Sequence, residues 1–167
     1  RSDNHVRFKI ETKLAKSSST DIEKAYPEFV RGLQKKPEIE KGEMLFKQIC
    51  ATCHKVNDIG ITVGPDLKNA YKNADETFLR NILFPSERIA SGYDTYIITT
   101  NSENKYAGIL VSESANSVIV RQAGGIDKTF LRKEIKQMTR SETSIMPAFG
   151  TMLTPNDCAN IIGWIKA

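Results

Sequence analysis

The stretch GEMLFKQICATCH, residues 42–54, decides how this sequence is interpreted. Its last five residues place two thiols on either side of a two-residue spacer, with an imidazole directly after the second thiol. Gly42, Phe46 and Cys50 recur at a spacing that brings residues onto one face of a helix. We therefore predict a helix over residues 37–49 that runs directly into the cysteine motif.

The C-x-x-C-H motif is the attachment signature of c-type haem. Cys50 and Cys53 can each form a thioether with one haem vinyl group, which places His54 under the iron as the proximal axial ligand. Two other interpretations stay open at this point. The thiols can form a thioredoxin-like redox pair, although no βαβ pattern surrounds them. They can also supply two zinc ligands, for which only Cys158 and His5 remain as further partners.

The four methionines are the candidates for the opposite axial position. Met44 lies too close to the motif in sequence to reach the other haem face, and Met138 falls within a predicted strand. Met146 lies in the loop SIMPAFG just before the last predicted helix, and we expect it to be the ligand. Met152 is the alternative in the same approach, and an open iron or ligation by His5 is the remaining one.

Composition and charge exclude several classes of protein. The chain has 167 residues, with 24 Lys+Arg against 20 Asp+Glu and a net charge of +4. This balance is typical of a soluble globular chain and too weak to indicate nucleic-acid binding. No apolar run approaches the ~18 residues of a membrane-spanning helix. The N-terminus lacks the apolar core of a signal peptide, so we expect a mature or truncated chain.

Helical patterns flank the motif on both sides. A helix is predicted before Pro37, either kinked at Pro27 or split there into two. Asp75 is the expected N-cap of a helix that reaches about Phe84, and Thr154 is the expected cap of the last helix.

Between these helices the hydrophobic period changes to that of strands. Runs rich in β-branched and aromatic residues predict five strands, separated by turn residues. Their ranges are 93–100, 105–113, 117–122, 127–131 and about 135–139.

Four segments together resemble a class I c-type cytochrome: GEMLFKQICATCH, VGPDL, IMPAFG and LTPNDCANIIGWI. The resemblance covers about residues 37–84 and 142–167. It implies a mainly α cytochrome c fold, α+β overall, with helices around one covalent haem c. A small antiparallel β meander or barrel is then an insertion at about residues 93–139.

The same resemblance implies particular contacts. Gly42 and Phe46 should pack against the Trp164 region of the last helix. Pro65 should offer its carbonyl to the imidazole of His54. The haem site should then comprise Cys50, Cys53, His54, Pro65, Leu67 and Met146, with His54 and Met146 on the metal.

The segment PSERI, the meander and the S-x-M-P loop resemble haem-binding domains at the C-terminal ends of large extracytoplasmic bacterial dehydrogenase-like proteins. We therefore expect residues 1–36 to be a tail and helical linker, and residues 37–167 to be the cytochrome c domain. The implied partner is a redox protein or a fused dehydrogenase domain, and the implied location is periplasmic or otherwise extracytoplasmic.

The expected function is electron transfer through one haem with His54/Met146 ligation and no catalytic residues. A peroxidase-like haem enzyme with an open distal site is one alternative. A partner-docking module with a structural haem is the other.

Overall fold

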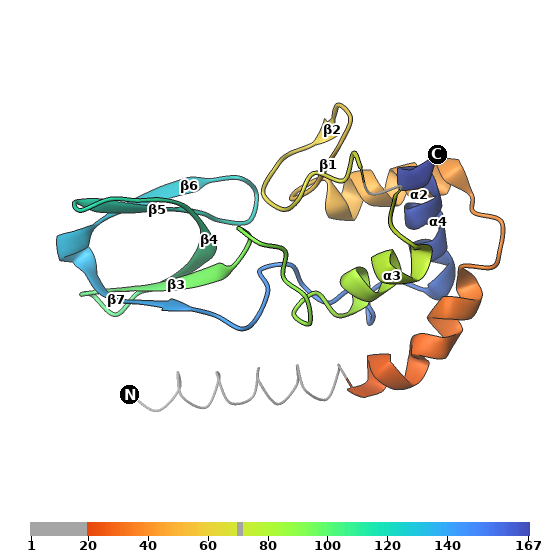
Figure 1. Ribbon diagram of the computed structural model, residues 1–167, viewed down its shortest axis with the longest axis horizontal. Coiled ribbons are helices and arrows are strands. Elements are labelled where there is room, and N and C mark those ends of the chain that lie inside the picture. The colour runs from red at the N-terminus through yellow and green to blue at the C-terminus, as the bar shows by residue number, and fades with distance from the viewer. Residues whose placement is uncertain (1–19, 70–71) are drawn as a thin grey trace.

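The computed structural model describes residues 20–69 and 72–167. The predicted tail over residues 1–19, which includes His5, lies outside these residues. Figure 1 shows the helices gathered on one side of the molecule and a five-stranded sheet on the other. The antiparallel sheet and the helices together make the α+β arrangement that the sequence predicts.

The N-terminal helical segment covers residues 20–32 and continues through Pro27 without a break. A single helix is therefore present, and the alternative of two short helices is wrong. Ile22 and Phe29 on this helix are buried in the main core. The described part of residues 1–36 thus packs against the rest of the helices.

Three further α-helices form the scaffold of the site: α2 (Ile39–Leu45), α3 (Asp75–Leu83) and α4 (Pro155–Lys166). Helix α2 begins two residues after Pro37, and its N-cap is Glu38. The backbone N–H of Glu38 donates to Oδ1 of Asn160, at 2.8 Å, which ties the start of α2 to α4.

Helix α4 begins as its sequence predicts. The hydroxyl of Thr154 accepts a hydrogen bond from the backbone N–H of Asp157, and the carboxylate of Asp157 accepts one from the backbone N–H of Thr154. This reciprocal capping box satisfies two helix-terminal donors.

Helix α3 differs at its first residue. Ala74 is the N-cap and makes no side-chain cap, whereas Asp75 is the first helical residue and forms an ion pair with Lys166. The expected cap at Asp75 is therefore wrong, because its carboxylate pairs with α4 instead of capping its own helix.

Helices α2 and α4 cross closely at Gly42. A Cβ on Gly42 would lie 2.1 Å from the carbonyl oxygen of Asn160, so only glycine permits this approach. One turn later the rings of Phe46 and Trp164 pack with their centroids 4.8 Å apart. Both contacts confirm the predicted packing of Gly42 and Phe46 against α4.

The main core lies among these helices. Its most buried side chains come from α3 and α4 and from the turn after α2, and Cys158 is among them as a small apolar residue. They are Phe46, Leu79, Leu83, Cys158, Ile161 and Ile162.

The sheet contains β3 (Thr95–Thr100), β4 (Lys105–Glu113), β5 (Ser117–Arg121), β6 (Asp127–Leu131) and β7 (Ile135–Arg140). Each predicted strand is present, with ends shifted by one or two residues. All pairs are antiparallel and the strand order is β6-β5-β4-β3-β7, so β3 to β6 form a meander and β7 returns beside β3.

Irregular pairing bends the sheet into a curled, open form. Register shifts occur between Thr99 and Thr100 and between Leu110 and Ser112. Bulges of this kind increase the local bend. Within the described residues no ladder joins β6 to β7, so the five strands are an open sheet rather than a closed barrel.

The sheet has a small core of its own. Ile98, Val118, Val120 and Phe130 are buried together, and Met138 packs on them from β7. The expectation that Met138 lies in a strand is confirmed.

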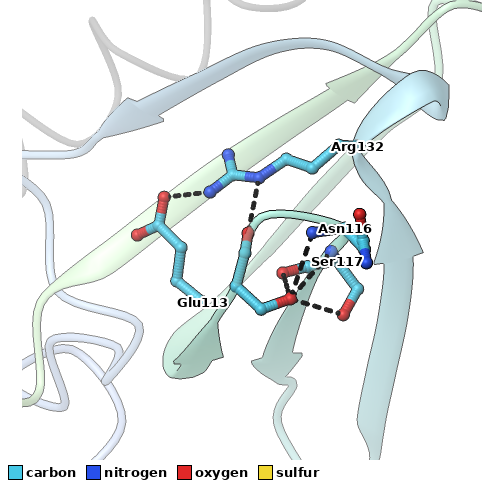
Figure 2. A network of polar contacts seen from close by, with 5 residues as sticks. Glu113, Asn116, Ser117 and Arg132 are labelled. Atoms are coloured by element: carbon cyan, nitrogen blue, oxygen red, sulfur yellow. Dashed lines mark hydrogen bonds and ion pairs between the residues drawn. The ribbon is translucent and has the colours of Figure 1, made fainter.

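A polar network holds the β4–β5 turn, at the end of the sheet far from the helices. Figure 2 shows Arg132 paired with the carboxylate of Glu113 and donating from Nε to the carbonyl of Ser114 at 3.2 Å. The backbone N–H of Ser117 donates to the hydroxyl of Ser114. This network is closed within the sheet.

Candidate haem site

A π-helical turn delivers the first thiol. Helix α2 changes at Phe46 into a π-turn, η1 (Phe46–Cys50), and the backbone N–H of Ala51 donates to the carbonyl of Phe46 at 2.9 Å. The wider turn displaces Cys50 from the face shared by Gly42 and Phe46. The prediction of a regular helix up to Ile49 is wrong in this respect. Such π-turns are frequent at functional sites.

Backbone hydrogen bonds fold the rest of the motif into a compact loop. The N–H groups of Cys53 and His54 both donate to the carbonyl of Cys50, at 3.0 and 2.8 Å. This folding carries both thiols and the imidazole on one short segment that leads directly from the π-turn.

The imidazole of His54 has a defined partner. Its Nδ1 lies 2.8 Å from the carbonyl oxygen of Pro65, as the resemblance implied. A carbonyl only accepts, so Nδ1 carries the proton and Nε2 keeps its lone pair. Burial lowers the pKa of His54, while the Pro65 carbonyl partly opposes this shift. A neutral imidazole with a free Nε2 is the form that binds a metal.

Two glycines shape the surroundings of His54. A Cβ on Gly64 would lie 2.6 Å from Cε1 of His54, so Gly64 contacts the ring directly. Gly60 has a φ of 89°, and a Cβ there would lie 2.0 Å from the carbonyl oxygen of His54. Sequence analysis did not assign these roles, although both glycines stand in the short loop between the motif and Pro65.

The loop that contains these glycines begins with a small hairpin. Strands β1 (Lys55–Val56) and β2 (Ile59–Gly60) pair directly after His54. The N–H groups of Val63 and Gly64 then donate to the carbonyl of Cys53, at 2.9 and 2.8 Å. The loop therefore turns back over the motif and brings Pro65 to the ring.

The state of the thiols favours attachment over redox or zinc chemistry. Burial, with a smaller contribution from Cys53, raises the pKa of Cys50 to about 12. Thioredoxin-like chemistry requires the opposite shift. The strands nearest the motif form an antiparallel hairpin, not a βαβ unit. Across residues 20–69 and 72–167 no group of three or more His, Cys, Asp or Glu side chains can hold a metal ion.

The structure separates the two candidate distal methionines. Met146 is partly buried and packs against the main core, as do Cys50 and Leu67. Its backbone N–H donates to the hydroxyl of Ser144 at 3.1 Å, which orders the turn before Pro147. Met152 has 68% of its surface exposed. Of the two, only Met146 shares the hydrophobic environment of the motif.

These donors suit an iron porphyrin. Two thiols match two thioether bonds, a neutral imidazole and a thioether are the axial ligands of low-spin c-type haem, and apolar side chains surround them. The residues present therefore fit the group that the motif implies.

The family model described as Cytochrome c matches residues 39–106. The matched range includes the C-x-x-C-H motif and the Pro65 loop, and it ends within β4, before Met146. No curated protein matches this chain. Within the described part of the chain, no helix is both long and apolar enough to cross a bilayer. Cytochrome c domains bind haem c covalently, typically carry electrons to partners and are usually extracytoplasmic. The chain contains a class I c-type cytochrome domain, matched over residues 39–106.

Proposed function

We propose that this chain transfers single electrons through one covalently bound haem c and is not itself an enzyme. Cys50 and Cys53 hold the haem, His54 and Met146 are its axial ligands, and Pro65 and Leu67 complete the site. The hydrogen bond between Nδ1 of His54 and the Pro65 carbonyl carries the proposal. It leaves Nε2 as the nitrogen that faces a metal.

The domain organisation follows the same proposal. Residues 37–167 form the cytochrome c domain, and the sheet within 93–139 is its insertion. Helix residues 20–32 pack on this domain through Ile22 and Phe29. The domain acts in the periplasm or another extracytoplasmic space and exchanges electrons with a redox partner protein or a fused dehydrogenase domain.

Each residue has a separate task in this mechanism. When bound, the haem supplies a reversible one-electron couple at its iron. The Pro65 carbonyl holds the His54 proton on Nδ1, fixes the plane of the ring and increases its basicity as a ligand. A thioether from Met146 favours ferrous iron and saturates the coordination. Saturated coordination leaves no position for peroxide, which distinguishes a carrier from a haem peroxidase.

The first test is covalent attachment. The chain is produced in a host that matures c-type cytochromes, and its mass is compared with that of the polypeptide. We expect the added mass of one haem that acid–acetone does not extract. Replacement of Cys50 and Cys53 by Ala should abolish the added mass. Extractable haem in the unmodified chain would contradict the proposal.

The second test assigns the distal ligand. Met146→Ala should abolish the weak far-red band from sulfur to ferric iron and lower the midpoint potential. Met152→Ala is the matched control and should retain both. The reverse result would make Met152 the ligand. Rapid cyanide binding together with sustained peroxidase turnover by the unmodified protein would favour the enzyme alternative.

A further inference from the structure

The inserted sheet touches the loop that positions His54. The contact comes from the β5–β6 turn, at the end of the sheet that faces the helices, and Figure 1 shows this turn beside the loop that follows β2. Gln122 and Ile126 close the turn with a backbone hydrogen bond of 2.9 Å. The turn itself passes through Gly124 and Gly125, whose φ angles are 83° and 79°.

Gly125 makes the apolar part of the contact. A Cβ at this position would lie 3.0 Å from Cδ1 of Ile61 and 3.7 Å from Cγ2 of Val63. Val63 is only 3% exposed, so the turn lies directly against a buried residue of the haem loop. Gly124 has a similar backbone conformation, but a Cβ there would have nothing within 4 Å.

Arg121 makes the polar part of the contact. Its guanidinium donates twice to the carboxylate of Asp127 across the hairpin, at 2.6 and 2.8 Å. This bidentate pair fixes the plane of the guanidinium. The remaining nitrogen, Nη1, donates to the carbonyl of Thr62 at 3.4 Å. The hairpin thus holds the backbone of the loop as well as its side chains.

The contacted residues are continuous with those that hold the ligand. Ile61, Thr62 and Val63 meet the sheet, and the next two residues, Gly64 and Pro65, meet the ring of His54. The backbone N–H groups of Val63 and Gly64 bind the Cys53 carbonyl on the motif. One short segment therefore has the sheet on one side and the proximal ligand on the other.

We propose that the β5–β6 hairpin braces this loop through Arg121 and Gly125, so that the inserted sheet sets the position of Pro65 against the His54 ring. Arg121 and Gly125 are positioning residues for the proximal ligand, and this inference rests on the proposed haem function. Loss of the brace weakens the His54–Pro65 hydrogen bond. A weaker hydrogen bond makes the imidazole a poorer donor to ferric iron, so the midpoint potential rises.

The test uses two matched pairs of variants in the full chain with haem attached. Arg121→Gln removes the brace, whereas Arg132→Gln removes a similar ion pair at the other end of β5, where no haem segment takes part. Gly125→Val and Gly124→Val place the same strained residue at neighbouring positions, but only the first presses on Ile61 and Val63. Valine is used because the tip of Ile61 can move aside for the single methyl of alanine.

Two measurements are compared within each pair. Amide hydrogen exchange at Val63 and Gly64 should become about tenfold faster in Arg121→Gln and Gly125→Val than in their controls, because local opening is easier. The midpoint potential should rise, and the low-spin signals of the ferric haem should shift, in the same two variants only. A merely structural loss of stability in the sheet would leave the potential unchanged.

The outcomes separate this inference from the function beneath it. If the unmodified chain has no covalent low-spin haem, the proposed function fails. If it has one, and the potentials and exchange rates of both pairs match their controls, the function stands and the brace is refuted.

Discussion

Replacement of Gly64 by Ala tests the contact between the loop and the proximal ligand. The added Cβ would lie 2.6 Å from Cε1, 3.0 Å from Nδ1 and 3.1 Å from Nε2 of His54. Ordinary contacts begin at 3.4 Å, so the ring or the loop must move by about 0.8 Å, which is 3.4 minus 2.6. A movement of this size along the hydrogen bond would stretch it from 2.8 Å to about 3.6 Å, beyond hydrogen-bonding distance.

The expected cost has two parts. The lost hydrogen bond contributes about 0.5–1.5 kcal/mol. Overpacking against the ring contributes about 1–3 kcal/mol. We therefore expect Gly64→Ala to lower the free energy of unfolding by about 2–4 kcal/mol. The midpoint potential should rise at the same time, because the imidazole loses basicity.

Denaturant unfolding and a redox titration of the haem-loaded chain measure both effects. Thr62→Ala is the control, since the Thr62 side chain is exposed in the same loop. That variant should stay within about 0.5 kcal/mol of the unmodified protein. If Gly64→Ala matched this control in stability and potential, Pro65 would not be the group that orients His54.

The remaining predictions concern the helices around the site. Gly42→Ala should lower the free energy of unfolding by about 3 kcal/mol, because its Cβ meets the backbone of α4, whereas the exposed Met44→Ala should barely change it; equal thermal midpoints for the two would contradict the close crossing. Phe46→Ala should cost about 3–5 kcal/mol in denaturant unfolding, since Phe46 is fully buried against Trp164, and a cost below about 1 kcal/mol would mean that this ring does not anchor the crossing. Thr154→Ala should cost about 1 kcal/mol near pH 7 through the lost cap. The pKa of Asp157 lies below its usual range because the Thr154 hydroxyl donates to its carboxylate, so this stabilisation is present above the unfolded pKa of about 3.9 and is lost as the pH falls through the folded value. The stability difference between Thr154→Ala and the unmodified chain should therefore narrow in acid, and a constant difference down to about pH 2 would exclude the capping box as its cause.

Much of this architecture could be predicted because its signals are local. The strands are bounded by turn residues such as Gly124 and Gly125, and they alternate clearly between the two faces. The start of α4 has its cap and its first-turn acid within four residues, Thr154 to Asp157. The cysteine motif is contiguous, so its chemistry is evident without the fold.

What could not be predicted depends on backbone geometry or on distant contacts. The π-turn after α2 has no side-chain signature, because only the backbone bond from Ala51 to Phe46 defines it. Strands β1 and β2 are two residues each, too short for any periodicity. Ala74 replaces Asp75 as a cap because Lys166, from the other end of the chain, binds the Asp75 carboxylate.

The contact between the β5–β6 turn and the haem loop belongs to the same class. Arg121 and Thr62 meet only when the whole sheet is folded. Neither residue has a sequence neighbour that indicates the other, so the roles of Gly60 and Gly64 beside them also became evident only in three dimensions.

The chain enters and leaves the sheet at almost the same point. Thr95 accepts a hydrogen bond from the backbone N–H of Ser141 at 2.8 Å, and Asp94 pairs with Arg140 at 2.6 Å. Paired antiparallel residues lie only about 5 Å apart, a gap that a tight turn can span. In evolutionary terms, the sheet is a unit that a gene can acquire or lose without moving the segments that carry His54 and Met146.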